Sequence, residues 1–168
     1  SKGEQIVQID ETDDYGINKA AIEDYLAVCT DQGWFAGTVV HPGHIVGPGH
    51  LPINPAGNKN LEVFSKLMHG KELSLPNFGR ETVHHVHAAD VAQIFVKSIQ
   101  NREKSAGQGF HAVSPAAVTL EGFARGAASW FGKEAELRFL PWSEWEELNN
   151  REDAALTLTH LLHSPSAS

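Results

Sequence analysis

Hydrophobic and polar residues recur along the chain with two periods, and the two periods alternate. Spacings typical of an amphipathic helix predict helices at 13–32, 59–69, 89–100, 119–131 and 153–162. Short β-rich runs predict strands at 34–41, 82–87, 109–113 and 136–140, with a weaker one near Leu73. The alternation of strands and helices predicts an α/β fold that contains part of a parallel sheet.

Turn and cap residues lie at the ends of several of these elements. The segment 42–57 holds many of the Pro and Gly residues and is predicted to be loop, with Asn58 capping the helix that follows. Ser143 and Glu146 have the spacing of a capping box. Residues 1–12 are expected to be irregular and the terminal "HSPSAS" disordered.

Composition and charge argue against two classes of partner, nucleic acids and membranes. The 168-residue chain has a formal net charge of -8 and no clustered Lys and Arg, which argues against nucleic acid. No apolar run approaches the ~20 residues needed to cross a bilayer, so no membrane partner is expected. The single cysteine, Cys29, cannot form an internal disulfide and is expected to pack in the core or at an interface. A cytoplasmic location is the default for such a chain.

The candidate chemistry begins with Tyr15 and Lys19 in "DDYGINKAAIEDYL". One helical turn separates them, so both side chains lie on one face. Because a fixed ammonium favours phenolate over phenol, Lys19 is expected to activate Tyr15 as an acid/base. A Y-x-x-x-K pair alone is common by chance, so the simpler interpretation is an exposed lysine on a solvated helix.

Motifs downstream of Tyr15 and Lys19 make the prediction of a catalytic pair more specific. After the tyrosine helix come "GTVVHPGHIVGPG" at 37–49, "TVHHVHAADVAQIFVKSI" at 82–99 and "LTLTHLLHSPS" near the end. In this order the chain resembles the extended short-chain dehydrogenases/reductases, the NAD-dependent epimerase/dehydratase family. The resemblance implies a Rossmann-like fold, NAD or NADP as cofactor, and Tyr15 and Lys19 as catalytic and cofactor-binding residues.

Two features of that family are missing from the chain. There is no Gly-rich dinucleotide fingerprint and no strand before the tyrosine helix that would carry a catalytic Ser or Thr. The chain is therefore interpreted as the C-terminal part of such an enzyme, inactive as isolated and not expected to bind NAD(P) tightly. Residues 1–50 would be a remnant of the Rossmann domain, and 51–168 mainly the substrate-binding lobe.

The departures from family motifs bear on the substrate. Many relatives read R-P-x-N-V-Y-G-P where this chain has 41–48, so Pro42, Gly43, His44 and Ile45 inherit a cofactor-contact role, unless they only shape a turn. His44 replaces an Asn that often touches substrate, and with His85 it is a candidate for binding substrate. Val83 replaces an Arg that holds phosphate in nucleotide-sugar enzymes, so a nucleotide-sugar substrate is not expected.

Ten histidines raise the alternative of a metal protein. On a strand His85 and His87 share one face, whereas His84 points to the other, and no Asp, Glu or Cys stands at ligand spacing. No metal site is predicted.

Three functional hypotheses remain open. The first is part of an NAD(P)-dependent epimerase, dehydratase or reductase acting on a small hydroxyl or carbonyl substrate. The second is a non-catalytic binding or dimerisation module derived from that family, and the third is the metal protein. A homodimer through the tyrosine helix is expected. The substrate, the choice between NAD and NADP, the reaction and the reason for the short chain are left open.

Overall fold

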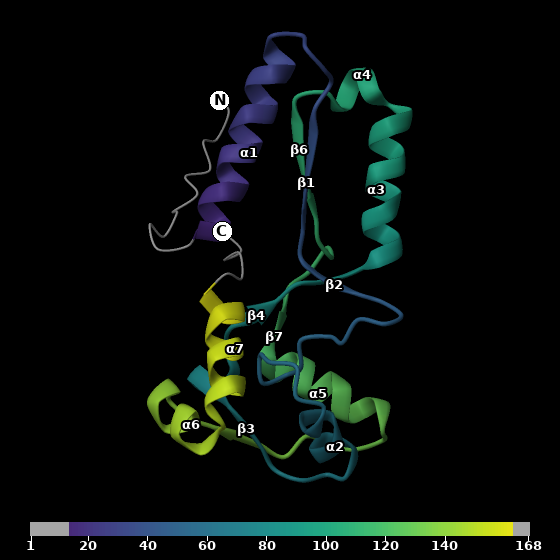
Figure 1. The fold of residues 1–168 in the computed structure, drawn as a ribbon. Helices are drawn as coiled ribbons and strands as arrows, with labels where there is room; N and C mark the ends of the chain where they lie inside the picture. Colours follow the sequence, from purple (N-terminus) through teal and green to yellow (C-terminus); the bar gives the residue numbers. More distant parts are fainter. Residues whose placement is uncertain (1–13, 163–168) are drawn as a thin grey trace. The chain divides into compact units, whose positions relative to one another are not determined.

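The computed structural model describes residues 14–162 and divides the chain into two compact units (Figure 1). Unit 1 consists of Ser1–His41 and Ala92–His111, and unit 2 of Pro42–Val91 and Ala112–Ser168. Each unit is therefore built from two segments that are far apart in the sequence. No helix in the described part is long and apolar enough to span a membrane.

Unit 1 contains three helices and a pair of neighbouring strands. Its elements are α1 (Asp14–Asp31), β1 (Thr38–Pro42), α3 (Ala88–Gln100), α4 (Arg102–Ser105) and β6 (Gln108–Ala112). The last residue of β1, the last residue of β6 and the first four residues of α3 belong to unit 2. Strands β1 and β6 are hydrogen-bonded to each other. The Thr38 hydroxyl donates to the Ser105 carbonyl at 2.8 Å, which fixes the start of β1 against the turn after α4.

Helix α1 ends close to the predicted residue because its last turn supplies its own cap. The Thr30 hydroxyl donates to the Leu26 carbonyl at 2.8 Å and accepts from the Gly37 amide at 2.9 Å. Gly33 follows with φ 73°, a conformation that glycine adopts without steric cost. Cys29 is fully buried, which confirms that it is a packing residue.

Unit 2 is built from three short strand pairs and a set of helices. Strand β2 (His44–Val46) pairs in parallel with β5 (His85–His87), and β3 (Leu73–Leu75) pairs in parallel with β8 (Leu137–Phe139). Strand β4 (Thr82–Val83) pairs antiparallel with β7 (Val118–Thr119). The helices are α2 (Glu62–Met68), the short 3-10 element η1 (Pro76–Gly79), α5 (Leu120–Trp130), α6 (Trp142–Leu148) and α7 (Arg151–Leu162).

A single hydrophobic core lies within unit 2. Leu67 of α2, Leu75 of β3 and Leu120 of α5 are buried together, and Figure 1 shows α2 beside α5. Trp145 of α6 is 1% exposed, and its indole N–H donates to the Ser74 carbonyl at 3.0 Å. The hydrogen bond lets a large aromatic ring enter the core without leaving a polar atom unpaired.

The strand predictions needed two corrections. The segment 42–57 is not loop throughout, because His44–Val46 forms β2 against β5. The run predicted as one strand at 82–87 is two strands, which pair with different partners: Thr82 aligns with Thr119, and His85 with His44. In both cases the partners are remote in the sequence, and a local pattern carries no information about them.

Two predicted caps were also wrong. Helix α6 begins after Pro141 with no side-chain cap, and Glu146 accepts instead from the indole N–H of Trp142 at 3.1 Å. At α2 the side chain that meets the first turn is Asn60, whose Oδ1 accepts from the Glu62 amide at 2.9 Å. Asn58 is buried and bonds elsewhere. The irregular start and the disordered end expected from the sequence lie outside the described residues.

The contrast between two tryptophans gives a stability test. Trp145→Ala should reduce the free energy of unfolding by about 3–5 kcal/mol, because it leaves a cavity and an unpaired Ser74 carbonyl. Trp130→Ala, at a ring that is 67% exposed, should cost less than about 1 kcal/mol. Urea unfolding followed by circular dichroism measures both. Equal losses for the two variants would contradict this description of the core.

Candidate functional site

The predicted catalytic pair lies on the surface of α1. Tyr15 and Lys19 are one turn apart, and the Lys19 Nζ stands 5.4 Å from the centroid of the Tyr15 ring. Tyr15 is 72% exposed and Lys19 is also exposed, so both polar ends reach the surface. The arrangement places a positive charge beside a phenol, which is the geometry that the helical spacing predicts.

A second polar cluster in unit 1 joins α1 to the end of β1. His41 Nε2 and Glu23 Oε1 are 3.1 Å apart, and the ring of His41 lies 5.3 Å from that of His111 on β6. Sequence reasoning did not single out Glu23 or His111. The pairing of β1 with β6 brings His111 to His41, and Glu23 reaches His41 from α1. Neither Glu23 nor His111 stands in a motif that could have indicated it.

The predicted cofactor-contact segment, Pro42 to Ile45, runs from the last residue of β1 through Gly43 into β2. The Gly43 amide donates to the Ala112 carbonyl at 3.0 Å, and the His44 amide donates to the His84 carbonyl at 2.7 Å. A Cβ on Gly43 would lie 2.6 Å from the His84 carbonyl oxygen. Only glycine permits this approach, which explains its position in the motif.

The two predicted substrate-binding histidines are neighbours. His44 and His85 are register partners in the β2–β5 pair, with ring centroids 6.1 Å apart. His160 of α7 meets His44 edge-on at 5.1 Å, and Phe123 of α5 packs against His85 at 5.4 Å. Sequence reasoning did not single out His160, although it lies in the segment "LTLTHLLHSPS", because it stands 116 positions after His44 and nothing local indicates that the two rings meet.

These histidines are kept neutral by their surroundings. Burial first of all, and then the positive charges of His160, His85, Lys59 and His84, lower the pKa of His44 to about 4. Burial also lowers the pKa of His85, against the opposing effect of a backbone hydrogen bond to Ile53. His84 Nδ1 and His85 Nε2 are buried ring nitrogens with no partner in the described structure. Such nitrogens are suited to hydrogen bonding a polar ligand.

The structure thus groups the predicted residues in two places. Tyr15 and Lys19 are together in unit 1, and Pro42 to Ile45 are together with His85 in unit 2. Among the described residues, no three His, Cys, Asp or Glu side chains are placed so that they could hold a metal ion.

The comparison with known families decides the class of the chain. The model of the NAD-dependent epimerase/dehydratase family matches residues 2–112, which is more than half of the sequence. The chain belongs to this family. No curated protein matches it.

Solved structures of similar fold are epimerase/dehydratase enzymes. RMD from Pseudomonas aeruginosa, complexed with NADPH, is 15% identical with a TM-score of 0.57, over 76% of this chain and 43% of that one. UDP-glucose 4-epimerase from Thermotoga maritima, with UDP-glucose, is 18% identical with a TM-score of 0.55, over 83% and 42%. UDP-N-acetylglucosamine 4-epimerase from Bacillus cereus is 19% identical with a TM-score of 0.57, over 88% and 54%.

These similarities establish the fold of the chain, which is mixed α/β and Rossmann-like. They confirm the fold class and the family that the motif order indicated. The chain spans about half the length of the structures it matches, or less.

The family cofactor can be tested against the residues present. Exposed Tyr15 and Lys19, both in unit 1, offer a hydroxyl and an ammonium to the ribose of a nicotinamide. The 168 residues contain no Gly-rich turn for the pyrophosphate. The residues present therefore fit the nicotinamide ribose and not the pyrophosphate.

The histidine cluster predicts acid sensitivity. Between pH 6.5 and about 4 the unfolded chain binds a proton at His44 that the folded chain does not, so stability should fall as the pH falls through this range. The loss should be about 1–2 kcal/mol, less than the full shift implies, since the ring is only half-buried. His44→Gln should flatten this part of the pH profile of unfolding.

His50→Gln is the matched control, because His50 is an exposed histidine of the same unit. It should leave the pH profile unchanged. Identical profiles for His44→Gln and the unmodified chain would show that this cluster does not control the acid sensitivity.

Proposed function

We propose that the chain supplies the acid/base pair and the substrate-binding lobe of an NAD(P)-dependent epimerase, dehydratase or reductase acting on a small hydroxyl or carbonyl compound. The observation that carries the proposal is the Lys19 ammonium 5.4 Å from the Tyr15 ring, in a chain of this family. The free, buried thiol of Cys29 is in keeping with work in the reducing cytoplasm.

In this proposal Tyr15 holds the proton that moves. Its hydroxyl donates to a substrate carbonyl oxygen, or accepts from a substrate hydroxyl, while the Lys19 charge stabilises the phenolate form. NAD(P), when bound, supplies or accepts the hydride. Lys19 also orients the nicotinamide ribose, so a single residue serves both binding and proton transfer. The isolated chain, with no phosphate cradle of its own, is proposed to be inactive.

The substrate lobe favours a ligand other than a nucleotide sugar. Val83 stands where relatives carry a phosphate-binding Arg, and its side chain is 1% exposed in the core of unit 2. The neighbouring His44 and His85 are uncharged at neutral pH and offer hydrogen bonds without charge. Uncharged imidazoles suit hydroxyl and carbonyl groups better than they suit a diphosphate.

Tyr15→Phe tests the catalytic part. In the enzyme that joins this chain to a dinucleotide-binding half, the variant should lower kcat at least about 100-fold, because only the transferred proton is lost. NAD(P)H affinity should change less than about twofold. Turnover is followed by nicotinamide absorbance against a panel of small ketones, aldehydes and secondary alcohols, and affinity by nicotinamide fluorescence.

Tyr25→Phe is the matched control, since Tyr25 is also an exposed tyrosine of α1. It should retain full activity. If Tyr15→Phe is as active as Tyr25→Phe, Tyr15 is not the acid/base.

A second candidate function, a binding or dimerisation module, is favoured by the surface of α1. Only Cys29 of this helix is buried, while Ile22, Tyr25 and Val28 are 54%, 61% and 57% exposed. Apolar side chains exposed together on a helix are typical of an interface. We propose that a second copy of the chain covers them, in a homodimer.

Val28→Glu should shift this dimer towards monomer, because it would bury an unpaired charge. Asn18→Glu introduces the same charge at an exposed polar position of α1 and should leave the association unchanged. Sedimentation velocity at matched concentrations measures both. A monomeric unmodified chain, or no difference between the variants, would contradict the dimer.

A further inference from the structure

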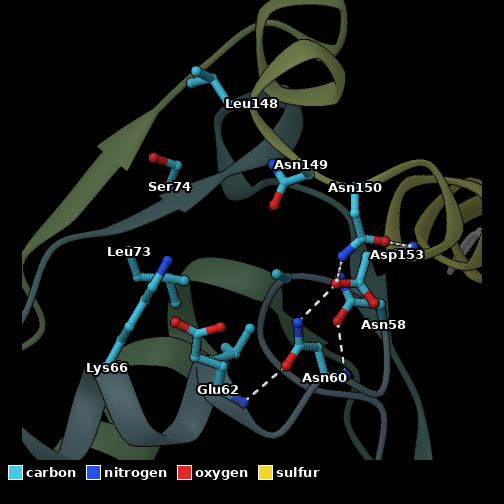
Figure 2. A pocket seen from close by; sticks show the side chains of 12 residues that line it. Asn58, Asn60, Glu62, Lys66, Leu73, Ser74, Leu148, Asn149, Asn150 and Asp153 are labelled. Atoms are coloured by element: carbon cyan, nitrogen blue, oxygen red, sulfur yellow. Dashed lines mark hydrogen bonds between the residues drawn. The ribbon is translucent and has the colours of Figure 1, made fainter.

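Unit 2 contains a polar cavity that the proposed reaction does not use. It has a volume of about 230 Å³ and lies between α2, β3 and the segment that joins α6 to α7 (Figure 2). The residues that carry its chemistry are Asn60, Glu62, Lys66, Ser74, Asn149 and Asp153. All six belong to one unit, so the cavity is complete within it.

One wall of the cavity is held rigidly by hydrogen bonds. The Asp153 Oδ2 accepts from the Asn60 amide at 2.8 Å and from the Asn150 amide at 2.6 Å. The Asn60 Oδ1 accepts from the Glu62 backbone amide at 2.9 Å. Both ends of the Asn60 side chain are thus occupied, and the Asp153 carboxylate is fixed at the rim. A wall organised in this way does not need to rearrange to receive a ligand.

Other polar groups of the lining face the cavity. Glu62 and Lys66 lie one turn apart on α2, and Figure 2 shows the carboxylate and the ammonium both directed into the open space. Neither side chain forms an ion pair or a side-chain hydrogen bond with any described residue. The Asn149 amide nitrogen donates to the Trp145 carbonyl at 2.6 Å, which leaves its oxygen turned towards the cavity.

The chemistry of these groups selects the ligand. Acceptors predominate, because Glu62, Asp153 and Asn149 offer oxygens, whereas Lys66 offers the only charged donor. The lining carries two carboxylates and one ammonium, so it favours a ligand with positive charge. Because polar side chains line most of the cavity, the rest of the ligand should carry hydroxyl groups. The volume is below the usual range for drug-sized pockets, which limits the ligand to a small molecule.

We propose that this cavity binds a small hydroxylated amine of about the size of a hexosamine. The ammonium group of the ligand lies between the Glu62 carboxylate and the Asn149 oxygen, and its hydroxyls bond to Lys66 and Asp153. The site requires neither NAD(P) nor Tyr15, so this proposal can be tested independently of the reaction proposed above.

The test compares two ligands that differ by one group. D-glucosamine and D-glucose have the same ring, and only the first carries an ammonium. In calorimetric titration of the chain at pH 7, glucosamine should bind at least about tenfold more tightly than glucose, as a charge-assisted hydrogen bond in place of a neutral one implies. No cofactor is present, so the result does not depend on catalysis.

Glu62→Gln should lower the affinity for glucosamine about tenfold and leave that for glucose nearly unchanged. Glu144→Gln, at an exposed glutamate of α6 outside the cavity, should change neither. Glu62 is exposed and its side chain holds no internal bond, so the fold should tolerate the change. A thermal melt checks this, and Glu62→Ala, which also removes the carboxylate, serves if Glu62→Gln does not fold.

Three outcomes would overturn the proposal. Glucose could bind as tightly as glucosamine, Glu62→Gln could behave like Glu144→Gln, or neither sugar could bind at millimolar concentration. Binding of uridine diphosphate that depends on Lys66 would also overturn it, because the cavity would then recognise an anion.

Discussion

The buried asparagine network at 54–60 is the constraint on which unit 2 depends. Asn54 and Asn58 are 0% and 2% exposed, and the Asn54 Oδ1 accepts from the backbone amides of Ala56 and Asn58 at 2.8 and 3.2 Å. The Asn58 amide donates to the Thr157 hydroxyl at 3.2 Å, and that hydroxyl donates to the Ala56 carbonyl at 3.1 Å. Because unpaired buried amides are costly, the segment has one shape in which every group is bonded.

That one shape positions both functional features of the unit. The Gly57 carbonyl lies 2.9 Å from His160 Nδ1, which holds the imidazole at the edge of His44. A few residues later, Asn60 fixes Asp153 at the rim of the polar cavity. The same hydrogen-bond network joins the Pro- and Gly-rich segment to helix α7, and it therefore supports both the histidine cluster and the cavity. A substitution at Asn58, which itself lines the cavity, would disturb the cavity and the histidine cluster together.

The two units also differ in how they use charge. In unit 1 the candidate chemistry lies on the surface, where the Lys19 ammonium stands beside an exposed phenol. In unit 2 burial lowers the pKa of His44 and His85, and neighbouring positive charges lower that of His44 as well. Val83, at the position that the motif comparison matches to an Arg, is a core residue that is 1% exposed. In the proposed function, the part of the chain that binds substrate therefore relies on uncharged groups.

Local features were determined by the sequence itself. Helices α1, α3 and α5 were predicted to within about two residues because their periodicity and caps are local, as at Thr119, whose hydroxyl accepts from the Gly122 amide at 3.0 Å. The closeness of Tyr15 and Lys19 follows from one turn of helix, and the order of motifs indicated the family. The tertiary structure decided four further features: strand β2, the division of 82–87 into two strands, the contact of His44 with His160, and the polar cavity. Their partners are tens of residues apart or more, and only long-range pairing and burial bring them together.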